Sequence, residues 1–183
     1  MNPIAIAAIE TSSIAQGIVT ADAMVKTADV ELLEVSTLSP GRYWILVGGD
    51  VASVRAALGR GLEVAADTLI DSLFIPHLHK GVLPALRGTV AANEDDALGV
   101  IETLSAASAI LAADLAVKAA DIQLRDVRLA NGLGGKGVVT LSGTVSAVQA
   151  GIEAGRADAQ RRGLLARAVV IARLDPRLRS RIG

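Results

Sequence analysis

The chain contains one sequence pattern twice. Residues 5–35 align with residues 97–127 without a gap, at an offset of 92, and 15 of these 31 positions are identical. The repeat resumes at an offset of 94, where Gly41-Arg42 matches Gly135-Lys136. Solenoid repeats have periods of roughly 20–50 residues, so a repeat of this length predicts a small domain present in tandem. Such a duplication favours a closed symmetric ring over an ordinary single-site enzyme.

Composition narrows the class of protein further. The formal net charge of −1 gives no indication of a nucleic-acid surface. The absence of cysteine excludes disulfides, thiolate nucleophiles and cysteine-ligated iron–sulfur clusters. The longest uncharged stretch, 137–152, is shorter than the ~18–20 apolar residues of a membrane span. No cationic segment precedes the apolar start, so no signal peptide is predicted and a cytoplasmic protein is expected.

Hydrophobic periodicity predicts the same elements in both copies. Apolar residues recur every three or four positions over 14–28, as in a helix, whereas Ser39-Pro40-Gly41 indicates a turn. The elements predicted for the first copy are a strand at 4–11, a helix at 14–28, strands at 30–38 and 43–47, a helix capped by Asp50 and a strand at 68–75. Those predicted for the second are a strand at 97–104, a helix at 105–120, a strand at 122–130, a turn at 131–135, a strand at 136–142, a helix at 144–162 and a strand at 164–172.

This β-α-β-β-α-β order is the ferredoxin-like split unit. The predicted fold class is therefore α+β, with two tandem units whose antiparallel sheets carry helices on one face. The predicted domains are 1–88 and 97–183, and the small, polar segment 89–96 is predicted to be the linker between them.

Four motifs carry a resemblance to a known family. They are Glu-Thr at the end of the first strand, Asp-x-x-x-Lys-x-Ala-Asp closing the first helix, Pro-Gly-Arg-Tyr after the second strand and Gly-Gly-Asp-Val opening the second helix. Together they resemble the bacterial microcompartment shell domain. Present twice and unpermuted, from Ile4 to about Ile171, they resemble the tandem-domain shell proteins of the propanediol-utilisation T type.

The resemblance implies a structural role for the protein in a microcompartment shell. Three chains would form a pseudohexagonal tile, the tile would pack edge to edge with other shell proteins, and a pore on the three-fold axis would pass small polar metabolites. The residues that match the pore turns are Leu38, Ser39, Pro40, Gly41, Asn131, Gly132, Leu133, Gly134 and Gly135. The residues that match the tile edge are Lys26, Lys118, Pro76, His77 and Arg173. The two lysines are predicted to govern association between tiles and not folding.

One departure from the family concerns a cofactor. The propanediol-type relatives have a cysteine directly before Pro-Gly, where three copies hold an iron–sulfur cluster. Ser39 occupies that position here, and a neutral hydroxyl is a poor iron ligand. No cofactor and no metal are therefore expected.

Other readings of the residues remain open but are less favoured. Glu10 and Glu102 could suggest a carboxylate pair, yet they are equivalent positions in separate copies, so a structural bond to a nearby backbone or hydroxyl group is expected. His77-x-His79 has no further ligand at a matching spacing. No catalytic residue is predicted, because the chain offers no nucleophile–base pair and no cofactor fingerprint. The alternative to a shell tile is a small-molecule-binding regulatory trimer of ferredoxin-like domains.

The sequence also predicts the charge near the pore. Arg42 and Lys136 lie directly behind the two turns, and these cations are expected to bias the pore toward anions at low salt. A small neutral or anionic polar metabolite, weakly bound, is the expected solute.

Overall fold

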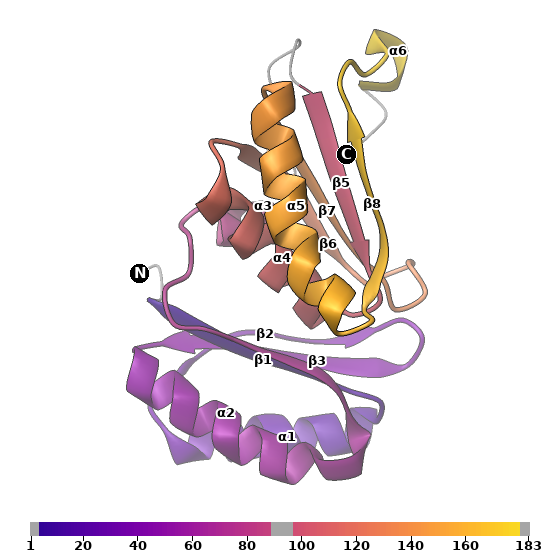
Figure 1. Ribbon diagram of the computed structural model, residues 1–183. Helices are drawn as coiled ribbons and strands as arrows, with labels where there is room; N and C mark the ends of the chain where they lie inside the picture. The colour runs from indigo at the N-terminus through magenta and orange to yellow at the C-terminus, as the bar shows by residue number, and fades with distance from the viewer. Residues whose placement is uncertain (1–3, 89–96, 180–183) are drawn as a thin grey trace. The chain divides into compact units, whose positions relative to one another are not determined.

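The computed structural model describes residues 4–88 and 97–179, which form two compact units (Figure 1). The first unit runs to Leu78 and also includes the segment Ala130–Gly135. The second unit contains His79–Leu129 and the chain from Lys136 onward. The predicted linker 89–96 lies outside the described residues.

The first unit is an antiparallel sheet with two helices on one face (Figure 1). Its elements are β1 (Ala5–Thr11), α1 (Ile14–Thr27), β2 (Glu31–Leu38), β3 (Arg42–Gly49), α2 (Val51–Ala65), a 3₁₀ turn (Ala66–Thr68) and β4 (Leu69–Ile75), and the strand order is β2-β3-β1-β4. Ser13 caps α1 by accepting from the Gln16 amide, and Asp50 caps α2. The predicted order of elements is confirmed.

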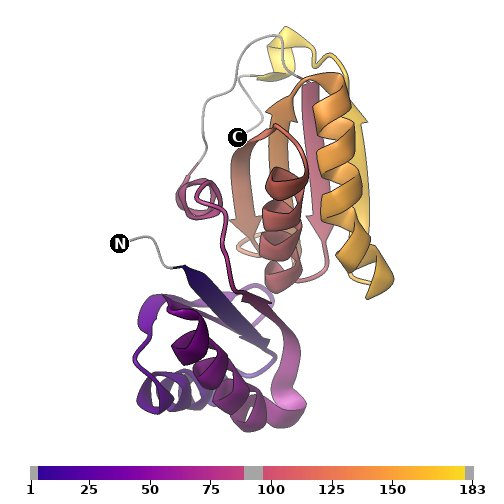
Figure 2. The ribbon, with the colours of Figure 1, turned by 60° about the vertical axis from the view of Figure 1, so that its left-hand side comes forward.

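The second unit repeats this arrangement. Its elements are α3 (Val82–Arg87), β5 (Ala97–Thr103), α4 (Ala106–Ala119), β6 (Gln123–Leu129), β7 (Gly137–Gly143), α5 (Val145–Arg161), β8 (Leu165–Ile171) and α6 (Pro176–Arg179), with strand order β6-β7-β5-β8. Figure 2 shows α4 and α5 on one side of this sheet. Ser105 and Thr144 cap these helices from the positions that correspond to Ser13 and Asp50.

The structure and the sequence place the boundary between the units differently. The sequence assigned residues 79–88 to the first domain, whereas α3 contacts β6 and α4 in the second unit. The His79 amide donates to Oδ1 of Asp114 at 2.8 Å, and that carboxylate is buried. A buried carboxylate requires donors, so this bond fixes the segment to α4. Helix α3 was not predicted, because six residues are too few to show a helical period.

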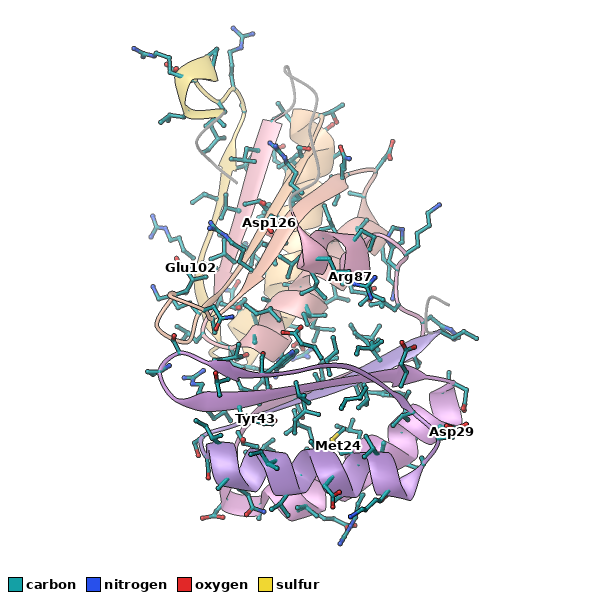
Figure 3. All side chains as sticks on the ribbon, turned by 180° about the vertical axis from the view of Figure 1, so that it is seen from behind. Met24, Asp29, Tyr43, Arg87, Glu102 and Asp126 are labelled. Carbon is teal, nitrogen blue, oxygen red and sulfur yellow. The ribbon has the colours of Figure 1, made fainter. Side chains whose placement is uncertain are left out.

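Small residues set how closely the helices approach in each core. In the first unit Met24 lies between the sheet and the helices (Figure 3), and Gly61 of α2 faces it together with Ile9. In the second unit Gly155 of α5 faces Ile101 and the backbone of Ala112. Aromatic residues make up only 2% of the chain, so tight contacts between aliphatic residues supply the packing.

Candidate functional site

The first candidate pore turn joins β2 to β3. The Gly41 amide donates to the Leu38 carbonyl at 2.9 Å, which closes the turn. Gly41 has a φ of 90°, a conformation that glycine adopts at little cost. Pro40 and Gly41 are exposed, whereas the Leu38 side chain is buried. The polar backbone at the tip of this turn, rather than the leucine side chain, faces solvent.

The second candidate turn joins β6 to β7 and is richer in glycine. The Leu133 amide donates to the Ala130 carbonyl at 3.1 Å. Gly132, Gly134 and Gly135 all have φ between 62° and 89°, which favours glycine at each position. Asn131, Gly132 and Gly134 are exposed, so this turn presents an amide side chain and bare backbone.

The two turns contact each other within the first unit. The Gly132 amide donates to Oγ of Ser39 at 3.4 Å. A hollow of about 320 Å³ lies beside this contact. It is lined by Ile14, Thr37, Leu38, Ser39, Pro40, Gly41 and Asn131. The structure thus brings together residues from both predicted turns, while their place on a three-fold axis stays a prediction.

Each cation behind the turns is paired with a carboxylate. Arg42 Nη1 lies 2.6 Å from Glu10 Oε1, and it also donates to the Gly135 carbonyl at 3.3 Å. Lys136 Nζ lies 2.8 Å from Glu102 Oε1. The sequence analysis expected each glutamate to bond a nearby backbone or hydroxyl group, and the structure pairs each of them with a cation. The sequence analysis placed Arg42 and Lys136 behind the turns as cations, and the structure adds their carboxylate partners.

The two candidate edge lysines have different surroundings. Lys26 pairs with Asp22 at 2.7 Å, and both side chains are exposed. Lys118 pairs at 2.5 Å with Asp114, whose side chain is only 3% exposed and also accepts the His79 amide. The sequence analysis predicted that Lys118 does not act in folding, whereas the structure places its ammonium beside a buried carboxylate. The i, i+4 spacing of Asp114 and Lys118 was the signal for the pair, but the burial of Asp114 was not readable from it.

The other candidate edge residues follow the last strand of each copy. His77 and Arg173 are exposed, and Pro76 is half-buried. His79 is used locally, since its Nδ1 accepts the Gly81 amide at 3.2 Å. Within 4–88 and 97–179, no three His, Asp or Glu side chains are grouped so that they could hold a metal ion. In the same ranges no helix combines the length and apolar character needed to cross a membrane.

Comparison with known proteins identifies the family. The BMC domain model matches the chain twice, over residues 5–78 and 97–174. The chain therefore belongs to the BMC-domain family of bacterial microcompartment shell proteins, as a protein with two tandem BMC domains.

Individual relatives agree with this assignment. The chain is 41% identical over 169 residues to the bacterial microcompartment shell protein PduT of Citrobacter freundii, covering 92% of each chain. It is 41% identical to a crystallised microcompartment protein of Desulfitobacterium hafniense DCB, with a TM-score of 0.84 over 96% of this chain and 98% of that one. The chain is 29% identical to the carboxysome assembly protein CcmO of Synechocystis. The matched region covers 93% of this chain and 61% of CcmO.

Proposed function

We propose that three copies of this shell protein close into a pseudohexagonal tile. Its edges meet other shell proteins, and the turns at 38–41 and 131–135 form a central pore for small polar metabolites. The observation that carries the proposal is that equivalent faces of the two domains differ in burial.

The first unequal face belongs to the first helix of each copy. On α1, Ile18 and Val19 are 54% and 53% exposed. Their equivalents on α4 are Ile110, which is fully buried, and Leu111, which is half-buried. We call the exposed surface formed by Ile14, Ile18, Val19 and Val25 the helix face. An apolar surface that is covered in one copy is thus uncovered in the other.

The second unequal face lies on the last strand of each copy. Val169 and Ile171 of β8 are 37% and 36% exposed. Strand register makes Leu73 and Ile75 of β4 their equivalents, and these are 4% and 2% exposed. We call the surface of Val169 and Ile171 the sheet face. On the first helices the exposed residues belong to the first domain, whereas on the last strands they belong to the second domain.

Two different apolar faces on one chain favour head-to-tail contact between copies. A helix face meeting a sheet face is a heterologous contact, and such contacts close into rings when the rotation permits. Two similar domains per chain then give six similar positions from three chains. Apolar surface buried at each contact stabilises the ring at about 25 cal/mol per Å² before the costs of association.

The mass of the particle in solution tests this proposal. Light scattering on dilute protein should give about three times the 18.7 kDa mass of the chain. A stable monomer or dimer would exclude the tile. Electron microscopy of concentrated protein should show extended sheets, whereas a regulatory trimer with a closed ligand cleft would stay as separate particles.

The proposal includes the absence of catalysis and of an iron–sulfur cluster. The relatives named above are shell and assembly proteins, and the pore turns offer hydroxyl, amide and backbone groups. Ser39 does not fit a cluster, because its Oγ is a neutral oxygen that accepts the Gly132 amide. The chain holds no cysteine that could take its place.

Iron analysis tests the cluster prediction. Protein that is isolated and then treated with iron and sulfide should contain far less than one iron per trimer and show no visible charge-transfer band. The Ser39→Cys variant, treated in the same way, is the matched control in which three thiolates would converge on one axis. Stoichiometric iron with a charge-transfer band in the unaltered protein would contradict the prediction.

The two edge lysines should respond differently to the same substitution. Lys26→Gln should leave the thermal midpoint nearly unchanged, because exposed ion pairs contribute about 0–1 kcal/mol, while sheet formation is lost. Lys118→Gln should lower the midpoint by several degrees, because it removes the cation beside a buried carboxylate. Circular dichroism melts and electron microscopy of both variants give the comparison. Equal midpoints for the two variants would show that Asp114 does not depend on Lys118.

A further inference from the structure

We propose that the pore selects small uncharged solutes that carry hydroxyl or carbonyl groups, and that Glu10 and Glu102 determine this specificity by cancelling the cations behind the turns. The inference rests on the proposed pore and narrows the class of metabolite that passes it. It excludes the anions that Arg42 and Lys136 would favour if they were alone.

The first cancelled cation is Arg42. Its Nη1 lies 2.6 Å from Oε1 of Glu10, and the glutamate side chain is completely buried. The same guanidinium donates to the Gly135 carbonyl, so it lies directly beneath the second turn. At this separation the two charges act on a distant solute as a dipole, whose field falls off faster than that of a single charge. Salt screens the remainder over about 8–10 Å.

The second domain achieves the same cancellation with different residues. Lys136 Nζ lies 2.8 Å from Oε1 of Glu102, and both side chains are partly exposed. The two glutamates are related by the offset of 92, and the two cations by the offset of 94. An arginine in one copy and a lysine in the other thus each face a glutamate from the first strand of their own domain. A trimer would hold six such pairs and no net charge from them.

What remains at the turns is hydrogen-bonding capacity without formal charge. Ser39 Oγ and the Gly132 amide face each other across the turns, and the Asn131 side chain is exposed. The hollow beside them also has apolar walls from Ile14 and Leu38. Donors, acceptors and apolar carbon together match a short alcohol, diol or aldehyde. Weak binding suits passage, because a solute that binds tightly leaves slowly.

Ion permeability of wild-type tiles in a planar lipid bilayer tests the charge balance. The reversal potential under a potassium chloride gradient gives the ratio of chloride to potassium permeability, which should be close to one for the unaltered trimer. Glu102→Gln leaves three uncompensated lysines per trimer and should raise the ratio at least about threefold. Lys136→Gln leaves three carboxylates and should lower it by a similar factor.

A remote pair supplies the matched control. Glu63 forms an exposed ion pair with Arg60 on α2, so Glu63→Gln makes the same change of charge away from the turns. It should leave the permeability ratio unchanged. Glu10→Gln is a second test, since the amide oxygen of glutamine still accepts a hydrogen bond from Arg42, and it should shift the ratio in the same direction as Glu102→Gln.

A matched pair of solutes tests the specificity directly. Glycerol and glycerate have similar sizes and differ in one carboxylate. Glycerol should reduce the wild-type ion current more than glycerate at equal concentration, and Glu102→Gln should reverse this order.

The outcomes separate this inference from the proposed function. An anion-selective wild-type pore, or a Glu102→Gln trimer with unchanged selectivity, would overturn the inference while leaving the pore in place. A crystal structure of the trimer in which Ser39 and Gly134 lie far from the three-fold axis would overturn the pore itself, and the inference with it.

Discussion

Ile18→Asp should convert the trimer into monomers at micromolar concentration. Ile18 is the most exposed apolar residue of the helix face, and the proposed tile covers it with the sheet face of the next copy. A carboxylate placed there loses its water on assembly and gains no partner, which costs several kcal/mol at each of three contacts. Light scattering should give the mass of a single chain.

The fold of the monomer should survive this substitution. Because Ile18 is already exposed within the chain, a charge at this position meets water and not the core. Circular dichroism should therefore show unchanged helix and strand content. The matched control is Val145→Asp, which places the same charge on an exposed valine at the start of α5, outside both faces, and should leave the trimer intact. A trimeric Ile18→Asp protein would show that the helix face is not an interface.

The order of elements was predictable because local signals and the repeat agreed. The caps Ser13 and Asp50, and the apolar periods after them, appear in both copies as residues that begin helices. The turn at 39–41 was marked by proline and glycine. The same signals occur in both copies, so the order of helices and strands could be predicted without knowledge of tertiary contacts.

The ion pairs behind the turns depend on strand pairing, which the sequence does not display. Glu10 lies opposite Trp44 in the pairing of β1 with β3, so Arg42 reaches it diagonally across the sheet. The residues are 32 positions apart in the chain. Without the register, the sequence analysis could place the two cations near the turns but could not identify the carboxylates that pair with them.

The sequence also could not predict that identical residues at equivalent positions of the two copies differ in burial. Ile18 and Ile110 are the same residue at the same position of the repeat, yet one is 54% exposed and the other fully buried. Periodicity assigns a residue to a face of its helix, but it does not say what covers that face. The observation that carries the proposed trimer therefore required the structure.

Gly155→Ala should destabilise the protein by about 1–3 kcal/mol, although alanine is the better helix former. A Cβ at position 155 of α5 would lie 2.6 Å from Cδ1 of Ile101 and 2.8 Å from the Ala112 carbonyl oxygen. The isoleucine can shift, but the carbonyl belongs to the backbone of α4, so the two helices would have to separate. Loss of this approach would loosen the core of the second unit.

The same substitution at Gly59 should have the opposite sign. Gly59 lies in α2, is exposed, and a Cβ there would meet nothing within 4 Å. Alanine removes unfolded-chain entropy without a clash, so Gly59→Ala should stabilise by about 0.5–1 kcal/mol. Gly61→Ala, two residues further on, should fall between the two, because its nearest atoms are the mobile ends of Ile9 and Met24. Thermal midpoints should therefore rank Gly59→Ala above Gly61→Ala and Gly61→Ala above Gly155→Ala. A Gly155→Ala protein as stable as the parent would show that α4 and α5 can separate freely, and that glycine is not what sets their approach.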